Sequence, residues 1–230
     1  MRRVFAFFLC LSLLIFPVKA AENEKYVALP FDDGPSGKFT RRLLAGLEER
    51  DVKAAFFLCG YRIKEYPDTA RMIWDAGHEI ALHGYSHDCM GDMSVSRVAQ
   101  ELRDTLALLP EGCEPTFLRP PGGISSDAVK QAAKDAGLAI LTWSVDPRDW
   151  ATSDTWAIEH AVLKNVKDGD IVLLHDMTTS SVQAARDFVD ALQSQGFEIV
   201  TVSELAKIRG VKLKPGQTYT CFPPKEEAVK

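Results

Sequence analysis

The sequence lacks several features that would each indicate a class of function. It has no block rich in lysine and arginine, which argues against a nucleic-acid partner. It has no carbohydrate-binding repeat, wall-anchoring module or low-complexity linker, so nothing marks a boundary between domains. The one long apolar run, residues 4–16, has 13 residues and is too short to cross a bilayer as a helix. We therefore expect a single domain after that run.

The first 20 residues have the pattern of a signal peptide. A charged start at Arg2-Arg3 precedes the apolar run, and a small-residue cleavage site follows at Ala20. We expect export to the periplasm, the cell wall or the medium without a stable membrane anchor after cleavage; a retained anchor is the alternative. Residues 21–230 carry 24 basic and 32 acidic side chains, a formal net charge of −8. This charge suits a neutral or mixed-charge polymer as the partner better than a polyanion. For the oligomeric state we expect a monomer.

Cysteine is sparse, and no Cys-x-x-Cys pair occurs, which argues against a thiolate zinc site or a redox dithiol. Four cysteines follow the signal: Cys59, Cys89, Cys113 and Cys221. An even number in an exported chain suggests disulfides, but four cysteines allow three pairings and the spacing does not choose among them.

Short apolar runs alternate with longer segments whose apolar residues recur every three or four positions. The runs are 26–31, 53–58, 78–82, 116–118, 139–144, 170–174 and 197–202, and the helical segments are 38–50, 63–76, 94–109, 126–136, 155–167 and 182–195. Helix start signals are Ser94, Ser126 and Asp154, and stop signals are Gly77, Gly137 and Gly196. The alternation predicts a barrel-like α/β fold of about seven strand–helix units over residues 21–210, followed by a C-terminal tail, 211–230. An open doubly wound sheet is the alternative.

Ionisable side chains follow the ends of five predicted strands. In parallel α/β folds these ends lie on one rim, where the functional loops gather. The residues expected to meet there are Asp32, Asp33, His83, His87, Arg119, Asp146, Asp149, Trp150, His175 and Asp176. Helix capping alone does not require histidine and arginine at such positions.

Two histidines four residues apart, His83 and His87, could converge on one metal ion. With one carboxylate of Asp32-Asp33 they would leave a position for water, a set that suits catalytic zinc or a related divalent ion. A His-x-x-x-His pair alone is weak evidence, because most such pairs are incidental. His78, at the start of a strand, and His160, inside a helix, are expected to take no part in the chemistry.

The second carboxylate of Asp32-Asp33 would be placed to act as a base on a metal-activated water. Arg119 could hold that carboxylate in orientation. His175 is the natural acid for a leaving amine or alkoxide, and either Asp149 or Asp146 could orient it and favour its protonated form. For each residue alone, a surface or capping role is the ordinary interpretation; for the whole set on one rim it is not.

Five short motifs occur in order. They are Phe31-Asp32-Asp33-Gly34-Pro35, His83-Gly84-Tyr85-Ser86-His87, Arg119-Pro120-Pro121-Gly122-Gly123, Asp146-Pro147-Arg148-Asp149-Trp150 and Leu173-Leu174-His175. In these motifs the chain, from residue 26 to 205, resembles the polysaccharide deacetylases of carbohydrate esterase family 4, the NodB-homology family. The resemblance implies a distorted (β/α) barrel and a divalent metal, usually zinc, with cobalt, nickel or manganese as alternatives. The implied metal ligands are Asp33, His83 and His87.

The resemblance also implies roles for the other motif residues. Asp32 would be the general base, paired with Arg119, and His175 the general acid, tuned by Asp149. The substrate side of the site would consist of Trp150 and Leu173, which wall the pocket for the acetyl methyl, and of Pro121 and Gly122. A backbone N–H near Gly122 would join the metal in stabilising the oxyanion.

Two positions depart from the family pattern. Pro30 stands where the family often has threonine or serine, a position not expected to do chemistry. Gly122 stands where the family often has an aromatic residue, so the sugar preference of other members transfers less safely. The expected activity is N-deacetylation of N-acetylglucosamine residues in peptidoglycan or a chitin-type glycan. The alternatives are an O-acetyl xylan esterase and a non-catalytic glycan-binding protein.

Overall fold

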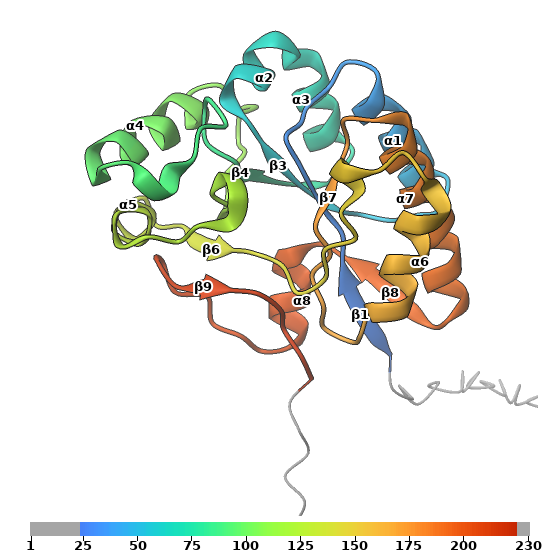
Figure 1. Cartoon of the computed structure of the whole chain (residues 1–230). Helices are drawn as coiled ribbons and strands as arrows, with labels where there is room; N and C mark the ends of the chain where they lie inside the picture. The colour runs from blue at the N-terminus through green and yellow to red at the C-terminus, as the bar shows by residue number, and fades with distance from the viewer. Residues whose placement is uncertain (1–23, 225–230) are drawn as a thin grey trace, which may run out of the picture.

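Parallel strands form the centre of the computed structural model, which describes residues 24–224 (Figure 1). Seven strands make one sheet in the order β7-β2-β3-β4-β5-β6-β9, and every neighbouring pair is parallel. The strands are β2 (Pro30–Asp32), β3 (Ala55–Leu58), β4 (Glu79–Leu82), β5 (Phe117–Leu118), β6 (Ala139–Leu141), β7 (Leu174–His175) and β9 (Thr218–Tyr219). A bridge between Val145 and Val172 joins the segments beyond β6 and before β7, so the sheet curls into a distorted barrel. The predicted fold class is confirmed, and the open doubly wound sheet is not formed.

The first apolar run, predicted as one strand over 26–31, forms two strands in different sheets. β1 (Lys25–Ala28) pairs with β8 (Phe197–Val200) in a separate two-stranded sheet, whereas β2 pairs with β3 and β7. The chain changes partners at the buried Leu29. Hydrophobicity alone could not show this break, because both strands are apolar.

Helices cover the outside of the barrel (Figure 1). They are α1 (Phe39–Glu48), α2 (Gly60–Glu65), α3 (Pro67–Asp75), α4 (Val95–Leu106), α5 (Asp127–Asp135), α6 (Thr155–Asn165), α7 (Thr179–Ser194) and α8 (Val202–Ile208). The helix predicted over 63–76 is two helices, because Pro67 starts a new one and Tyr66 before it leaves the helical conformation. The three predicted N-caps, Ser94, Ser126 and Asp154, each accept a hydrogen bond from a first-turn N–H.

Strand alternation divides the apolar side chains of the sheet between one cluster inside the barrel and two clusters under the surrounding helices. Phe57 points into the barrel, where it clusters with Phe117 and Leu141, while its neighbours Phe56 and Leu58 face the surrounding helices. Phe222, from the segment predicted as a tail, is buried in the inner cluster. This segment also contributes β9 to the sheet, so residues 211–222 pack as part of the barrel.

The predicted signal peptide, 1–20, lies outside the described residues. Within 24–224, no helix is long and apolar enough to cross a membrane. The four cysteines after residue 20 are all free, so the expectation of disulfides is wrong. They lie in dissimilar surroundings: Cys59 is buried at the end of β3, and Cys89 is exposed beside a short turn of helix.

Candidate active site

One cavity of about 440 Å³ opens at the carboxyl ends of the strands. It is lined by Asp32, Asp33, His83, His87, Gly122, Trp143, Asp146, Trp150, Leu173 and His175. Asp32 ends β2 and His175 ends β7, and the two are register partners on neighbouring strands. Register partners in a parallel pair point to the same face, so the alternation that separates Asp32 from Asp33 brings Asp32 and His175 together. The rim predicted from strand order is present.

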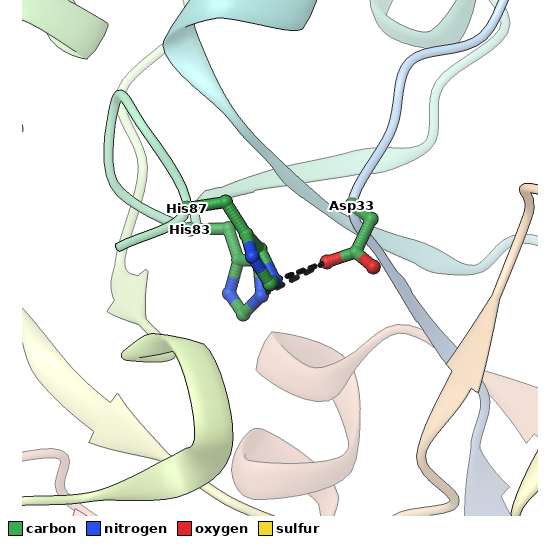
Figure 2. A group of neighbouring side chains, drawn as sticks. All are labelled: Asp33, His83 and His87. Atoms are coloured by element: carbon green, nitrogen blue, oxygen red, sulfur yellow. Dashed lines mark ion pairs between the residues drawn. The ribbon is translucent and has the colours of Figure 1, made fainter. Parts of the chain in front are cut away.

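Asp33, His83 and His87 converge on a common point (Figure 2). The Oδ1 atom of Asp33 lies 3.2 Å from Nε2 of His83 and 2.9 Å from Nε2 of His87. This oxygen is buried and makes no well-directed hydrogen bond, so the close approach is not explained by hydrogen bonding within the chain. Two imidazole nitrogens and one carboxylate oxygen suit zinc or a related divalent ion, and the residues therefore fit the metal that the sequence predicts.

The orientation of His83 is fixed by its other ring nitrogen. Nδ1 of His83 lies 2.7 Å from the carbonyl oxygen of Arg119, which can only accept, so Nδ1 carries the proton. Nε2 then presents its lone pair to the cluster, the arrangement usual for a metal-binding histidine. Burial alone would raise the pKa of Asp33, but the proximity of His83 and His87 lowers this pKa far below its usual range.

The loop that carries the two histidines is held by a residue that the sequence analysis missed. Glu101, on α4, is buried, and its Oε2 accepts hydrogen bonds from the backbone N–H groups of Tyr85 and Ser86, both at 2.8 Å. Its Oε1 accepts from Arg97 at 2.6 Å. In the sequence Glu101 is one of many polar residues of an amphipathic helix, and nothing local distinguishes it.

Backbone strain is concentrated at this rim. Among residues 24–224 four non-glycine residues have positive φ: Asp33 (70°), His87 (65°), Arg148 (56°) and Asp51 (52°). The first three lie in the loops that form the site. Left-handed backbone costs a non-glycine residue of order 1 kcal/mol, and it persists where the surrounding structure enforces it.

Asp32 is bound to a fully buried arginine. Nη1 of Arg119 donates to Oδ1 of Asp32 at 2.6 Å. The guanidinium also donates to the carbonyl oxygens of Leu141 and Thr142, at 3.3 and 2.9 Å, and lies 4.3 Å from the centre of the Phe57 ring. Arg119 is thus fixed on several sides, and it fixes one oxygen of Asp32 while the carboxylate still reaches the cavity.

His175 is held by both oxygens of Asp149. Oδ1 accepts from Nδ1 of His175 at 2.8 Å, and Oδ2 accepts from its backbone N–H at 2.9 Å. Burial would lower the pKa of His175, but the Asp149 hydrogen bond and the charges of Asp149, Asp32 and Asp33 outweigh it and raise the pKa to about 9. The imidazolium is therefore the main form at neutral pH, with Nε2 free to donate. Of the two aspartates considered from sequence, Asp149 makes this contact; Asp146 instead accepts from the N–H of Arg148.

The remaining predicted residues fall inside and outside the cavity. Gly122, Trp150 and Leu173 line it, whereas Pro121 is buried and does not belong to the lining. Trp143 also lines it, although its place two residues after β6 gave no motif to identify it.

The other rim and control residues have structural surroundings. Asp176 is buried and accepts a hydrogen bond from the Thr40 hydroxyl. Its carboxylate lies so close to Gly34 that a Cβ added at Gly34 would be 2.9 Å from it. His78 is buried and accepts from the N–H of Ala54 at 3.1 Å, as expected of a structural histidine.

Comparisons with known proteins identify the family of the chain. The polysaccharide deacetylase family profile matches residues 19–141. A peptidoglycan-N-acetylglucosamine deacetylase of Bacillus cereus is 37% identical over 193 residues, which cover 81% of this chain and 91% of that one. The peptidoglycan-N-acetylmuramic acid deacetylase PdaC of Bacillus subtilis is 34% identical over 81% of this chain, but the match spans only 40% of PdaC.

Solved structures give the same result. A family 4 acetyl xylan esterase from Clostridium thermocellum, in complex with a cobalt ion, superposes with a TM-score of 0.81 at 32% identity, covering 86% of this chain and all of that one. A structure described as T48 deacetylase with substrate has a TM-score of 0.79 at 33% identity, covering 85% of this chain and 96% of that one. Deacetylases of this family depend on a metal, and Asp33, His83 and His87 form a group able to hold one. The chain belongs to the polysaccharide deacetylase family, carbohydrate esterase family 4, and is a deacetylase.

Proposed function

We propose that the protein removes the acetyl group from N-acetylglucosamine-type residues in peptidoglycan or a chitin-like glycan and releases acetate. The observation that carries this proposal is the placement of Asp32, bound to Arg119, and His175, bound to Asp149, on neighbouring strands around one group of possible metal ligands. Relatives named as deacetylases of peptidoglycan and of chitooligosaccharides support the substrate class.

The proposed metal ligands are Asp33, His83 and His87. Zinc is the ion we propose, with cobalt, nickel or manganese as alternatives, since two imidazoles and a carboxylate accept each of them. Bound there, the ion would supply Lewis-acid chemistry, polarising the acetamide carbonyl and acidifying water.

Asp32 is the proposed general base. Arg119 occupies its Oδ1 at 2.6 Å, and its Oδ2 lies 3.9 Å from Nε2 of His83, beside the ligand group. The free oxygen is therefore placed to accept the proton of the attacking water. Because Arg119 is tied to two backbone carbonyls as well, the carboxylate cannot swing away from the water.

His175 is the proposed general acid. Asp149 holds its Nδ1 and keeps the imidazole protonated, so Nε2 can donate a proton to the amine that leaves when the C–N bond breaks. The acid must start protonated, and the contact with the Asp149 carboxylate favours that state of His175.

The proposed acetyl pocket consists of Leu173 and Trp150, both on the cavity wall. The N–H of Gly122, on the same wall, would donate to the developing oxyanion.

We also propose that the protein is exported through residues 1–20 and acts outside the cytoplasm, which is consistent with relatives named for peptidoglycan. We propose that it acts as a monomer.

Acetate release from N-acetylated peptidoglycan and chitooligosaccharides by residues 21–230 tests the function. We expect activity that a chelator abolishes and added zinc restores. Asp32→Asn should lower kcat at least about a hundredfold, since a positioned base contributes that much, and His175→Ala should do the same. Full, chelator-insensitive activity in Asp32→Asn would refute the mechanism.

A second activity, O-deacetylation of xylan, is favoured by the likeness to the acetyl xylan esterase. An alkoxide can leave without being protonated first, whereas the nitrogen of an amide must be protonated before the C–N bond breaks, so the ester needs less help from the acid. If acetylxylan is the true substrate, it should be cleaved faster than either N-acetylated glycan, and the loss in His175→Ala should be smaller on it.

A further inference from the structure

Three of the four tryptophans lie between positions 143 and 156, in the segment that leaves β6 and enters α6. Trp143 and Trp150 line the catalytic cavity. Trp156, the second residue of α6, does not, and no step of the proposed reaction uses it.

Trp156 is the most exposed large hydrophobic side chain among residues 24–224, at 66%, and Trp150 is the second, at 57%. Large aromatic side chains normally bury most of their surface, so two exposed indoles in one short segment indicate a surface that contacts something else. Trp143, the first tryptophan of the segment, differs from the other two, since it is half-buried and packs closely on Gly123.

Both exposed rings are held in place by a nitrogen-containing neighbour. The imidazole of His160, one turn along α6, stacks on the Trp156 indole with ring centres 5.0 Å apart and planes 9° apart. The guanidinium of Arg148 lies 5.2 Å from the centre of the Trp150 ring. Each indole therefore has one face supported by the chain and a limited choice of positions, which reduces the entropy lost when a ligand packs on it.

The position of α6 puts Trp156 beside the mouth of the cavity. A helix that follows a parallel strand begins near the rim where that strand ends and runs back along the barrel. The turn at Asp149–Ala151, which holds Trp150, is followed within four residues by the start of α6 at Thr155, and α6 then packs along α7 (Figure 1).

We propose that Trp156 forms a second sugar-binding position, next to the cavity, for the glycan chain whose acetylated residue occupies the site. This inference rests on the proposed function. A pyranose ring presents a C–H face that packs on an indole and a hydroxyl edge that stays in water, so an exposed tryptophan suits it. A polymer must leave a cavity that holds one acetylated residue, and the exposed ring of Trp156, on the segment that follows Trp150, could receive one of the next units. The resulting enzyme would prefer long chains to short ones.

The test compares two N-acetylglucosamine oligomers, the dimer and the hexamer, by acetate release. In Trp156→Ala we expect KM for the hexamer to rise about tenfold, as for a lost aromatic stacking contact, with dimer kinetics unchanged. Trp156→Phe should keep most of the hexamer affinity. Ile208→Ala, which trims another exposed apolar residue on α8, is the matched control and should change neither substrate. Equal effects of Trp156→Ala on dimer and hexamer, or no effect on either, would overturn the proposal.

A binding measurement separates this inference from the proposed function. Calorimetry on Asp32→Asn, in which turnover should be slowed at least about a hundredfold, should show tighter binding of the hexamer than of the dimer, and adding Trp156→Ala should remove the difference. If the wild-type protein releases no acetate from these oligomers, the proposed function fails, and the binding data alone decide on Trp156. Hexamer binding that is absent, or unchanged by Trp156→Ala, overturns the sugar-binding position.

Discussion

Replacing Asp149 by asparagine should move the alkaline limit of activity to lower pH. Asp149 supplies the two largest contributions that raise the pKa of His175 to about 9, compared with 6.5 for an unperturbed imidazole. Asparagine has the same shape but no charge. The loss of this charge should therefore lower the pKa of His175 by about two units, while the effects of burial and of the remaining carboxylates stay unchanged.

The direction and the size of this shift in the pH profile follow from the proposed role of His175 as the general acid. Its proton is available below the pKa and is lost as pH rises through it, so with no metal bound the imidazole of the native protein should stay protonated to about pH 9. At pH 8 the protonated fraction would fall from about nine-tenths to about one-tenth in Asp149→Asn, nearly a tenfold loss in addition to any loss from misorientation. A cation at Asp33 would lower the pKa of His175 in both proteins. The quantity to compare is therefore the difference between the pH values at which the native protein and Asp149→Asn lose activity on the alkaline side.

The assay is a pH profile of kcat/KM for acetate release, with the imidazole titrated in parallel by NMR. Asp146→Asn is the control, because it removes a carboxylate from the same loop and cavity but no hydrogen bond to His175. Its alkaline limb should stay within about half a unit of the native one. A limb that does not move in Asp149→Asn, or that moves equally in Asp146→Asn, would refute the assignment.

Three further substitutions test how the site is held. Glu101→Gln should weaken zinc affinity about tenfold, because its carboxylate holds the loop between the two histidines, whereas Asp104→Asn on the same helix should not; a competition titration with a chelator decides. Arg119→Met should destabilise the fold by about 3–5 kcal/mol in urea unfolding, since it leaves Asp32 buried without its partner, and a loss under 1 kcal/mol would show that water replaces the guanidinium. Gly123→Ala should lower the free energy of unfolding more than Gly122→Ala, although both positions have positive φ. An added Cβ at 123 would lie 2.8 Å from the Trp143 ring, whereas at 122 it would meet nothing within 4 Å. Equal losses would contradict this packing.

Much of the site was predictable because it depends on a regular feature of parallel sheets. Strand ends share one rim, so Asp32, Arg119 and His175 could be expected to meet from the alternation alone. The spacing of His83 and His87 then indicated two possible metal ligands, and the family resemblance selected Asp33 as the third. These signals are local, and the geometry they require is common to the fold.

What the sequence did not show depends on contacts between distant segments. The break at Leu29 arises because β1 and β2 pair with different strands, and β9 pairs with β6 across nearly 80 residues. Glu101 matters only because α4 packs behind the loop between the histidines. The disulfides expected from an even number of cysteines are absent among the described residues, since an even count says nothing of which thiols meet.

The left-handed backbone at Asp33 sets the direction in which this enzyme can lose its activity. Glycine adopts that conformation without strain, so an Asp33→Gly change would remove a proposed metal ligand while relieving of order 1 kcal/mol of backbone strain. It would also remove a buried oxygen that has no well-directed hydrogen bond within the chain. Selection for folding alone would then not eliminate the inactive form. Only continued demand for the reaction preserves the aspartate, and a lineage released from that demand would drift toward a stable, inert barrel.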